Sequence, residues 1–281
     1  SKQIFYIGKG TKNRVFEHEK ESLVSPDSEK LKLKTIAELT NRNLWRGEVS
    51  MEWTSEKYKN NLLEYEKKDG IKAITVYCLI MGSAFFHGWL YTTNTSVLIL
   101  NLSQVWIPLV LILLFACFFH YNKQKIDSVG INTDKLKNSI ILGVIGGIFL
   151  LAIQTVLFKA QGKSISFMEP LLINWIIFFF AALEEEIIFR GYIQTRLSGL
   201  IRNQWIVGII NSVLFLSIHY PVRWVIIGKL YFDVLPVEYV ISLLALHFFC
   251  DAVYKRTNCL WGSVILHIIY NAVVGDGCRR F

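Results

Sequence analysis

Long apolar runs dominate the sequence after residue 72 and restrict the folds that this chain can adopt. A helix needs about 20 apolar residues to cross the hydrocarbon core of a membrane. Hydrophobic residues make up 53% of the whole chain, more than a soluble domain usually carries. The pattern therefore predicts an all-α, multi-span transmembrane helical bundle of about seven helices. The candidate spans are approximately residues 73–92, 98–119, 138–158, 171–197, 204–222, 236–254 and 259–275.

The segment before these runs is hydrophilic. Residues 1–72 hold 15 of the 30 Lys and Arg and 12 of the 22 Asp and Glu. We therefore expect a short soluble arm of mixed α/β character at residues 1–70 and a transmembrane domain at residues 71–281. The first apolar run begins near Ala73, so the first span is expected to direct insertion without a signal peptide. The formal net charge of +8 favours an anionic lipid surface and gives no reason to expect a nucleic acid partner.

The arm contains a segment that resembles part of a nuclease signature. Within residues 1–45, the order of Tyr6, Gly8, Arg14 and His18 is similar to the second half of the GIY-YIG motif. The opening Gly-Ile-Tyr strand of that family is missing, so the resemblance is to a truncated domain. The alternative is that these are ordinary residues of a cytoplasmic or fused piece, and we expect no nuclease activity.

Basic residues in the connecting segments predict the orientation in the membrane. Lys and Arg in short loops favour the cytoplasmic side. The segment 121–137 contains four lysines, and Lys255 and Arg256 precede the last apolar run, whereas residues 93–103 contain no Lys or Arg. We expect an integral membrane protein, in the plasma membrane of a prokaryote, with a cytoplasmic N-terminus.

Polar residues interrupt the apolar runs of the second half at three places. Ionisable residues in such helices are costly, normally face a protein interior or a wet cavity, and mark function. Residues four apart share one face of a helix, so Glu186 and Arg190 can pair, and His267 and Asn271 can point into one cavity. If the fourth helix continues to about Leu197, the carboxylates of Glu185 and Glu186 lie at a depth in the membrane similar to that of His219 and His267.

Together these side chains can activate water. A carboxylate whose pKa is raised by burial and by a like-charged neighbour can act as a general base. An imidazole can orient the water, stabilise an oxyanion or bind a metal. The alternatives without catalysis are a structural ion pair between Glu186 and Arg190 and hydrogen-bonded core histidines at His219 and His267.

The order and spacing of the polar residues resemble the motifs of the CPBP intramembrane proteases, over approximately residues 138–275. That family includes CAAX prenyl-protein endopeptidases and Abi-like proteins of bacteriocin processing and immunity. The three motifs are, in order, Glu185-Glu186-x-x-x-Arg190, Phe215-x-x-x-His219 and His267-x-x-x-Asn271.

The resemblance implies an intramembrane endopeptidase that hydrolyses a membrane-associated substrate, such as a prenylated or leader peptide, with glutamate-activated water. It assigns catalysis to Glu185, Glu186, His219 and His267. The supporting residues that it implies are Arg190, Asn271 and Phe215.

The family resemblance leaves the cofactor and one alternative function open. The protein could use no metal, or it could be a metalloendopeptidase with a divalent ion such as Zn²⁺ held by His219, His267 and either Glu185 or Glu186. The alternative function is a non-catalytic bacteriocin immunity protein or membrane scaffold of the same fold. Oligomeric state is not indicated.

Several polar residues lack motif partners. We expect Glu184 to face another side of its helix or to take part in helix packing. The remaining histidines are expected at interfaces or in packing, and they are His87, His120 and His247.

Overall fold

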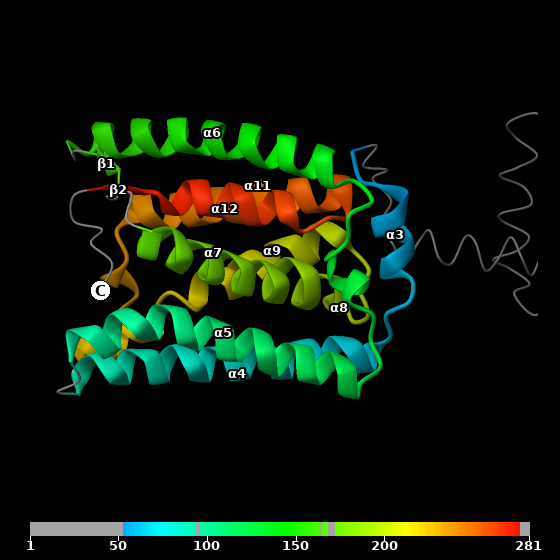
Figure 1. The fold of residues 1–281 in the computed structure, drawn as a ribbon, viewed down its shortest axis with the longest axis horizontal. Helices are drawn as coiled ribbons and strands as arrows, with labels where there is room; N and C mark the ends of the chain where they lie inside the picture. Colours follow the sequence, from blue (N-terminus) through cyan, green and yellow to red (C-terminus); the bar gives the residue numbers. More distant parts are fainter. Residues whose placement is uncertain (1–52, 94–95, 163–164, 168–171, 276–281) are drawn as a thin grey trace, which may run out of the picture. The chain divides into compact units, whose positions relative to one another are not determined.

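The computed structural model describes residues 53–93, 96–162, 165–167 and 172–275. The resemblance to a nuclease at residues 1–45 lies outside these residues. The predicted all-α class is confirmed, because helices form nearly all of the described secondary structure (Figure 1). Two three-residue strands, β1 (Ile165–Phe167) and β2 (Val273–Gly275), pair in antiparallel orientation.

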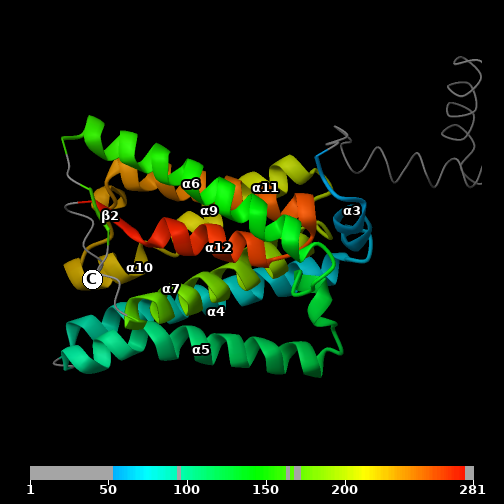
Figure 2. The same cartoon turned by 45° about the horizontal axis from the view of Figure 1, so that its top comes forward.

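The helices follow one another through short connections, as Figures 1 and 2 show. Short 3-10 turns, η1 and η3, lie in two of the connections, and a π-helical segment, η2, follows α7 without a break. The bounds are α3 (Glu56–Leu62), α4 (Lys67–Thr92), α5 (Val97–Tyr121), η1 (Ile126–Val129), α6 (Leu136–Ala160), α7 (Leu172–Glu186), η2 (Ile187–Gln194), α8 (Thr195–Leu197), α9 (Gln204–Ser217), α10 (Pro221–Ile227), η3 (Phe232–Val234), α11 (Val237–Thr257) and α12 (Trp261–Asn271).

Five helical segments of the described chain are long and apolar enough to cross a membrane, judged by length and composition. They support the prediction of an integral membrane protein. The segments are Lys67–Thr92, Leu102–Tyr121, Leu136–Ala160, Gln204–Ile227 and Val237–Thr257.

The other two predicted spans differ from these five. The fourth is helical from residue 172 to residue 197, as expected, but it combines α7, η2 and α8 and carries the charged residues. The last is α12, which has 11 residues and is followed by β2. A helix of that length extends about 16 Å, which is too short to cross the hydrocarbon core.

Small residues bring α6 and α12 into close contact. A methyl group added at Gly143 would lie 2.2 Å from the carbonyl oxygen of Gly262, so only glycine fits at this contact. The hydroxyl of Ser139 accepts a hydrogen bond from the Gly262 amide at 2.9 Å and donates one to the Cys259 carbonyl at 2.9 Å. Close approach through small residues is a common way in which membrane helices associate. It fixes α12, which carries His267.

The opposite side of the bundle consists of α4 and α5. Both views show α7 between this pair and the group of α6, α11 and α12 (Figures 1 and 2). Helix α4 packs against α10, and α5 packs against α7. Gly88 of α4 allows this approach, because an added methyl group there would lie 2.9 Å from the Cα atom of Val222.

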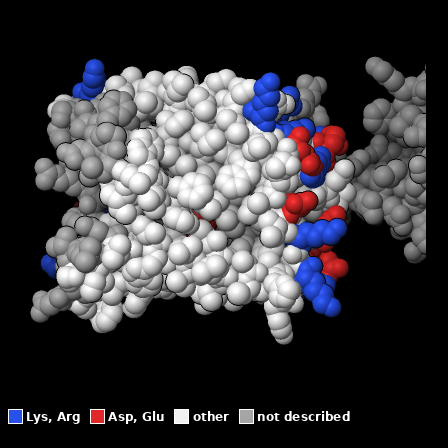
Figure 3. Space-filling view, in the orientation of Figure 1, with Lys and Arg blue, Asp and Glu red and all other residues white. Residues whose placement is uncertain are grey.

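The charged residues of the bundle gather mainly at the end where α3 lies, and the middle of the face in Figure 3 is almost uncharged. Residues 53–62 pack onto this end, where Ser55 donates its amide hydrogen bond to the Lys255 carbonyl at 2.9 Å. The side chain of Tyr58 is buried there. The division of the chain at residue 70 stays a prediction.

Candidate active site

The first motif lies where α7 passes into the π-helical segment η2. All eight residues of η2 are buried, since the segment is apolar apart from Arg190 and Gln194. Single π-turns inside α-helices are frequent at functional sites. The prediction that this helix continues to Leu197 is confirmed, and the continuation places the carboxylates within the bundle.

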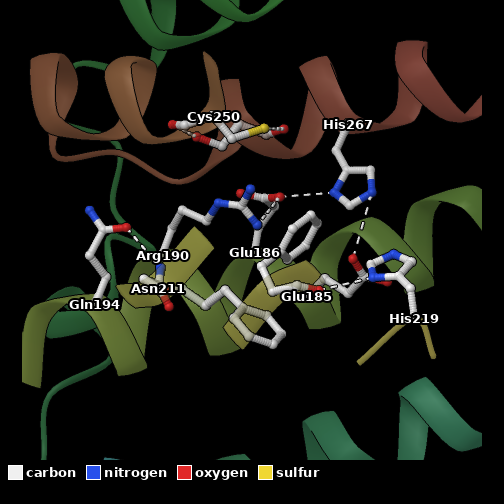
Figure 4. A network of polar contacts seen from close by, with 11 residues as sticks. Glu185, Glu186, Arg190, Gln194, Asn211, His219, Cys250 and His267 are labelled. Atoms are coloured by element: carbon white, nitrogen blue, oxygen red, sulfur yellow. Dashed lines mark hydrogen bonds and ion pairs between the residues drawn. The ribbon is translucent and has the colours of Figure 1, made fainter. Parts of the chain in front are cut away.

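Glu186 forms the centre of a buried cluster with one side chain from its own helix and one from α12. Its Oε1 atom lies 2.8 Å from Nδ1 of His267 and 3.1 Å from Nη1 of Arg190 (Figure 4). The side chains of Glu186 and Arg190 are fully buried, and that of His267 is 5% exposed. The predicted pairing across four residues is therefore found, and it also holds the histidine.

Arg190 is held by the charge of Glu186 and by the ring of Phe215. The contact with Glu186 is an ion pair by distance but lacks the angles of a hydrogen bond. The guanidinium carbon lies 4.4 Å from the centre of the Phe215 ring, within the range of a cation–π interaction. Phe215 thus packs against the cluster, and the supporting role that the family resemblance implies for it stays a prediction.

Glu185 lies one residue earlier and faces a different environment. Its side chain is 21% exposed, and its Oε2 atom lies 3.8 Å from Nε2 of His267. In Figure 4 its carboxylate lies beside the rings of His219 and His267. The structure therefore brings the two carboxylates and the two histidines of the prediction together.

His219 follows α9 and precedes α10. Its Nδ1 atom lies 2.9 Å from the carbonyl oxygen of Phe215, which can only accept a hydrogen bond. Nδ1 therefore carries a proton, and in the neutral ring Nε2 is left as an acceptor. The spacing of four between Phe215 and His219 produces this bond.

A cavity of about 290 Å³ adjoins Glu185 and His219. Glu184 also lines it, whereas we expected this residue to face another side of its helix or to take part in helix packing. The lining comes from α4, α5, α7, α10, α11 and the connection before α10, and consists of Ile80, Ser83, Ala84, His87, Tyr91, Gln104, Ile107, Pro108, Leu111, Ile177, Ala181, Glu184, Glu185, Ile218, His219, Val222, Arg223 and Tyr239.

The other histidines and Asn271 take separate positions. His247 is fully buried and packs 5.5 Å from Phe215, as expected for a packing residue, and His120 is exposed near the end of α5. His87 lines the cavity, which the sequence did not indicate. Asn271 is buried one helical turn after His267, at the end of α12.

A second polar network connects η2 to side chains of α9 and α11. Asn211 of α9 donates from Nδ2 to the Phe189 carbonyl at 3.1 Å and to Oε1 of Gln194 at 3.0 Å (Figure 4). Gln194 in turn donates to Asp251 of α11, whose other oxygen lies 2.8 Å from Nζ of Lys255. The network fixes the turn of helix that carries Arg190. Sequence analysis missed these residues because each is a single polar side chain in a different helix.

Among the residues that the structure describes, no group of three or more His, Cys, Asp and Glu side chains is placed to hold a metal ion. These residues therefore give no support to the predicted metalloendopeptidase. Nδ1 of His267 contacts Glu186 and Nδ1 of His219 contacts a carbonyl group, so Nε2 is the ring atom that each histidine has left for a ligand or substrate.

An enclosed set of carboxylates and imidazoles within apolar helices is the arrangement expected of an intramembrane hydrolase. Residues 167–273 match a protein-family model described as type II CAAX prenyl endopeptidase, Rce1-like. This match confirms the predicted relation to the CPBP and CAAX protease family and supports, at the level of the family, a CAAX-type intramembrane protease in a lipid bilayer. No curated protein and no solved structure matches the chain. The matched segment contains all the predicted site residues and excludes α4, α5 and α6.

Proposed function

We propose that this protein is an intramembrane endopeptidase in which Glu185 activates water for attack on a peptide bond. The observation that supports this proposal is that Glu185 lines the same cavity as His219, whereas Glu186 is bound to Arg190 and His267. One carboxylate is thus available to a substrate, and the other holds a histidine in place. Glu185, His219 and His267 are the proposed catalytic residues, and Glu186, Arg190 and Phe215 are positioning residues.

In the proposed reaction, water lies between Glu185 and Nε2 of His219, both of which can accept its protons. The water oxygen attacks the carbonyl carbon of the peptide bond while Glu185 takes a proton. General base catalysis of this kind contributes about 10²- to 10⁴-fold. Glu185 then gives the proton to the nitrogen of the leaving amine, and the carbon–nitrogen bond breaks to leave a carboxylic acid and an amine.

His267 is assigned to the oxyanion of the tetrahedral intermediate. Glu186 binds Nδ1 and thereby directs Nε2 toward the carboxylate of Glu185, 3.8 Å away. When Nε2 carries a proton it can donate to the oxyanion, and a donor fixed before the reaction stabilises this charge best. Asn271 lies on the same face of α12 as His267 and is proposed as a supporting residue.

The proposed substrate is a membrane-associated peptide. The cavity lies among helices that can span a membrane, and the matched family is named for CAAX prenyl endopeptidases. A prenylated peptide with a CAAX ending is therefore the first substrate to test. A cytoplasmic N-terminus is proposed because Lys and Arg side chains gather, together with Asp and Glu, at the end of the bundle near α3 (Figure 3), and Lys and Arg beside membrane spans favour the cytoplasm.

The test uses the purified full chain in lipid vesicles with a farnesylated CAAX peptide, and mass spectrometry of the products. We expect cleavage by the parental protein and by Glu64→Gln, which changes an exposed carboxylate outside the cavity. We expect Glu185→Gln to lose the activity. Equal cleavage by Glu185→Gln would overturn the assignment. Binding of the peptide without cleavage by the parental protein would instead favour a non-catalytic scaffold.

A further inference from the structure

The wall of the cavity that faces the proposed catalytic residues belongs to α4 and α5. These helices lie outside the segment that matches the family model, residues 167–273. Nine of the residues that line the cavity come from them, and these nine are Ile80, Ser83, Ala84, His87, Tyr91, Gln104, Ile107, Pro108 and Leu111. Their spacing of three and four places each set on one face of its helix.

Pro108 changes the hydrogen bonding of the α5 face. Proline has no N–H group, so it cannot donate to the carbonyl of Gln104, the residue four positions earlier. Both residues line the cavity. The Gln104 carbonyl on this wall therefore lacks the backbone N–H donor that it would have in a regular helix.

Two side chains beside this carbonyl also have acceptor atoms. Nε2 of Gln104 donates to the hydroxyl of Tyr91 at 3.3 Å, which leaves Oε1 as an acceptor. Ser103 donates its hydroxyl to the Leu100 carbonyl at 2.6 Å, and its oxygen lies 3.0 Å from Nε2 of His87. Nε2 of His87 is therefore the donor of that pair, and in the neutral ring Nδ1 is an acceptor.

Acceptor atoms thus belong to the wall of a cavity that has both apolar and polar lining residues. A ligand that binds to these acceptors must carry N–H or O–H groups. The backbone of an extended peptide has one N–H group at each residue other than proline, whereas a lipid acyl chain has none.

We propose that the faces of α4 and α5 around His87, Gln104 and Pro108 bind the backbone of the peptide substrate opposite Glu185 and His219. This proposal rests on the proposed function, since it names how the same site holds its substrate. It assigns substrate positioning to helices outside the matched segment. Figure 3 shows acidic atoms in a hollow at the middle of an otherwise nearly uncharged face, where a substrate could enter from the bilayer.

The first experiment measures cleavage of the farnesylated CAAX peptide by Pro108→Ala and Gln104→Leu. The alanine restores an N–H group that pairs with the Gln104 carbonyl and also favours the helix, so a loss of binding would not result from unfolding. We expect each variant to raise KM about three- to tenfold with kcat within about twofold, the effect of losing one hydrogen bond. Leu109→Ala is the control, because Leu109 of the same helix is exposed on the outer surface and does not line the cavity. An unchanged KM in both variants would overturn the proposal.

The second experiment measures binding without turnover. Ser83→Cys in a Glu185→Gln background places a thiol on the cavity wall, and the exposed Cys78 of the same helix is an internal control. We expect the farnesylated CAAX peptide to slow alkylation at position 83 at least about threefold, measured for each peptide fragment by mass spectrometry, and to leave Cys78 unchanged.

The two experiments separate this proposal from the proposed function. Cleavage by the parental protein without protection of position 83 and without a change in KM would overturn the role of the wall and leave the protease intact. Protection without cleavage by the parental protein would support the peptide-binding wall and overturn the protease. The absence of both would overturn both.

Discussion

Glu185 and Glu186 are neighbours in the sequence but lie in two different regions of the site. Glu186 is fully buried between Arg190 and His267, away from the cavity. Glu185 is partly exposed and shares the cavity with His219. Successive residues of a helix point about 100° apart, and this rotation, together with the contacts of Glu186 with Arg190 and His267, separates the two carboxylates. A pair of adjacent acidic residues can therefore supply both a reactive group and the support for its partner.

The largest expected effect is on catalysis and concerns the cavity region. Glu185→Gln keeps the shape of the side chain but removes the base, so we expect kcat to fall about a thousandfold or more, equivalent to about 4 kcal/mol. The melting temperature in detergent should change by less than about 2 °C, because Glu185 is partly exposed and its contact with Nε2 of His267 is long, at 3.8 Å. Cleavage kinetics and thermal unfolding of the same preparation check both parts. A large loss of stability with normal kcat would reverse the roles assigned to the two carboxylates.

The second-largest expected effect is on stability and concerns the buried region around Glu186 and Arg190. Arg190→Gln leaves the charge of Glu186 without its cation, and breaking a buried pair in this way costs about 3–5 kcal/mol. We expect a much lower melting temperature than for Lys137→Gln, which changes an exposed residue of α6. The double variant Glu186→Gln with Arg190→Met should recover part of the loss, since it leaves no unpaired charge. Additive losses in the double variant would contradict the assignment of a coupled pair.

The sequence was sufficient to predict the buried region because its contacts follow from helix periodicity. Glu186 and Arg190 are four residues apart on one helix, and the apolar residues after them predicted that the helix continues to Leu197. The motif order placed His267 near them. The class of fold followed from the length of the apolar runs.

The cavity region could not be predicted in the same way, because it depends on how separate helices pack. Glu184 was expected to face another side of its helix or to take part in helix packing, yet the position of α5 against α7 leaves it on the cavity wall. His87 and Gln104 show no motif, since each lies among apolar residues at a spacing typical of any buried helix face. The short α12 was also missed, because composition does not show where an apolar run stops being helical.

His267 belongs to the buried region and His219 to the cavity region, and substitutions of the two are expected to have smaller effects on stability. His267→Ala removes the hydrogen-bond partner of Glu186, so we expect a loss of stability of about 1–3 kcal/mol in addition to the loss of activity. His219→Ala removes a side chain that is hydrogen-bonded to the backbone carbonyl of Phe215 beside the cavity, and we expect loss of activity with less than about 1 kcal/mol of destabilisation. Unfolding in detergent and cleavage rates distinguish the two. Equal destabilisation by both substitutions would show that the regions are not energetically distinct.

The smallest expected effect concerns the network behind η2. Asn211→Ala removes the donor to the Phe189 carbonyl and to Gln194, so we expect destabilisation of about 1–2 kcal/mol. Ser212→Ala is the matched control, because the Ser212 hydroxyl donates to the Ile209 carbonyl of its own helix, and we expect it to cost less than about 0.5 kcal/mol. If the network positions Arg190 and thereby Glu186, kcat should fall in Asn211→Ala while KM stays constant, since the wall formed by α4 and α5 is unchanged. A rise in KM with constant kcat would show instead that α9 acts on substrate binding through the cavity.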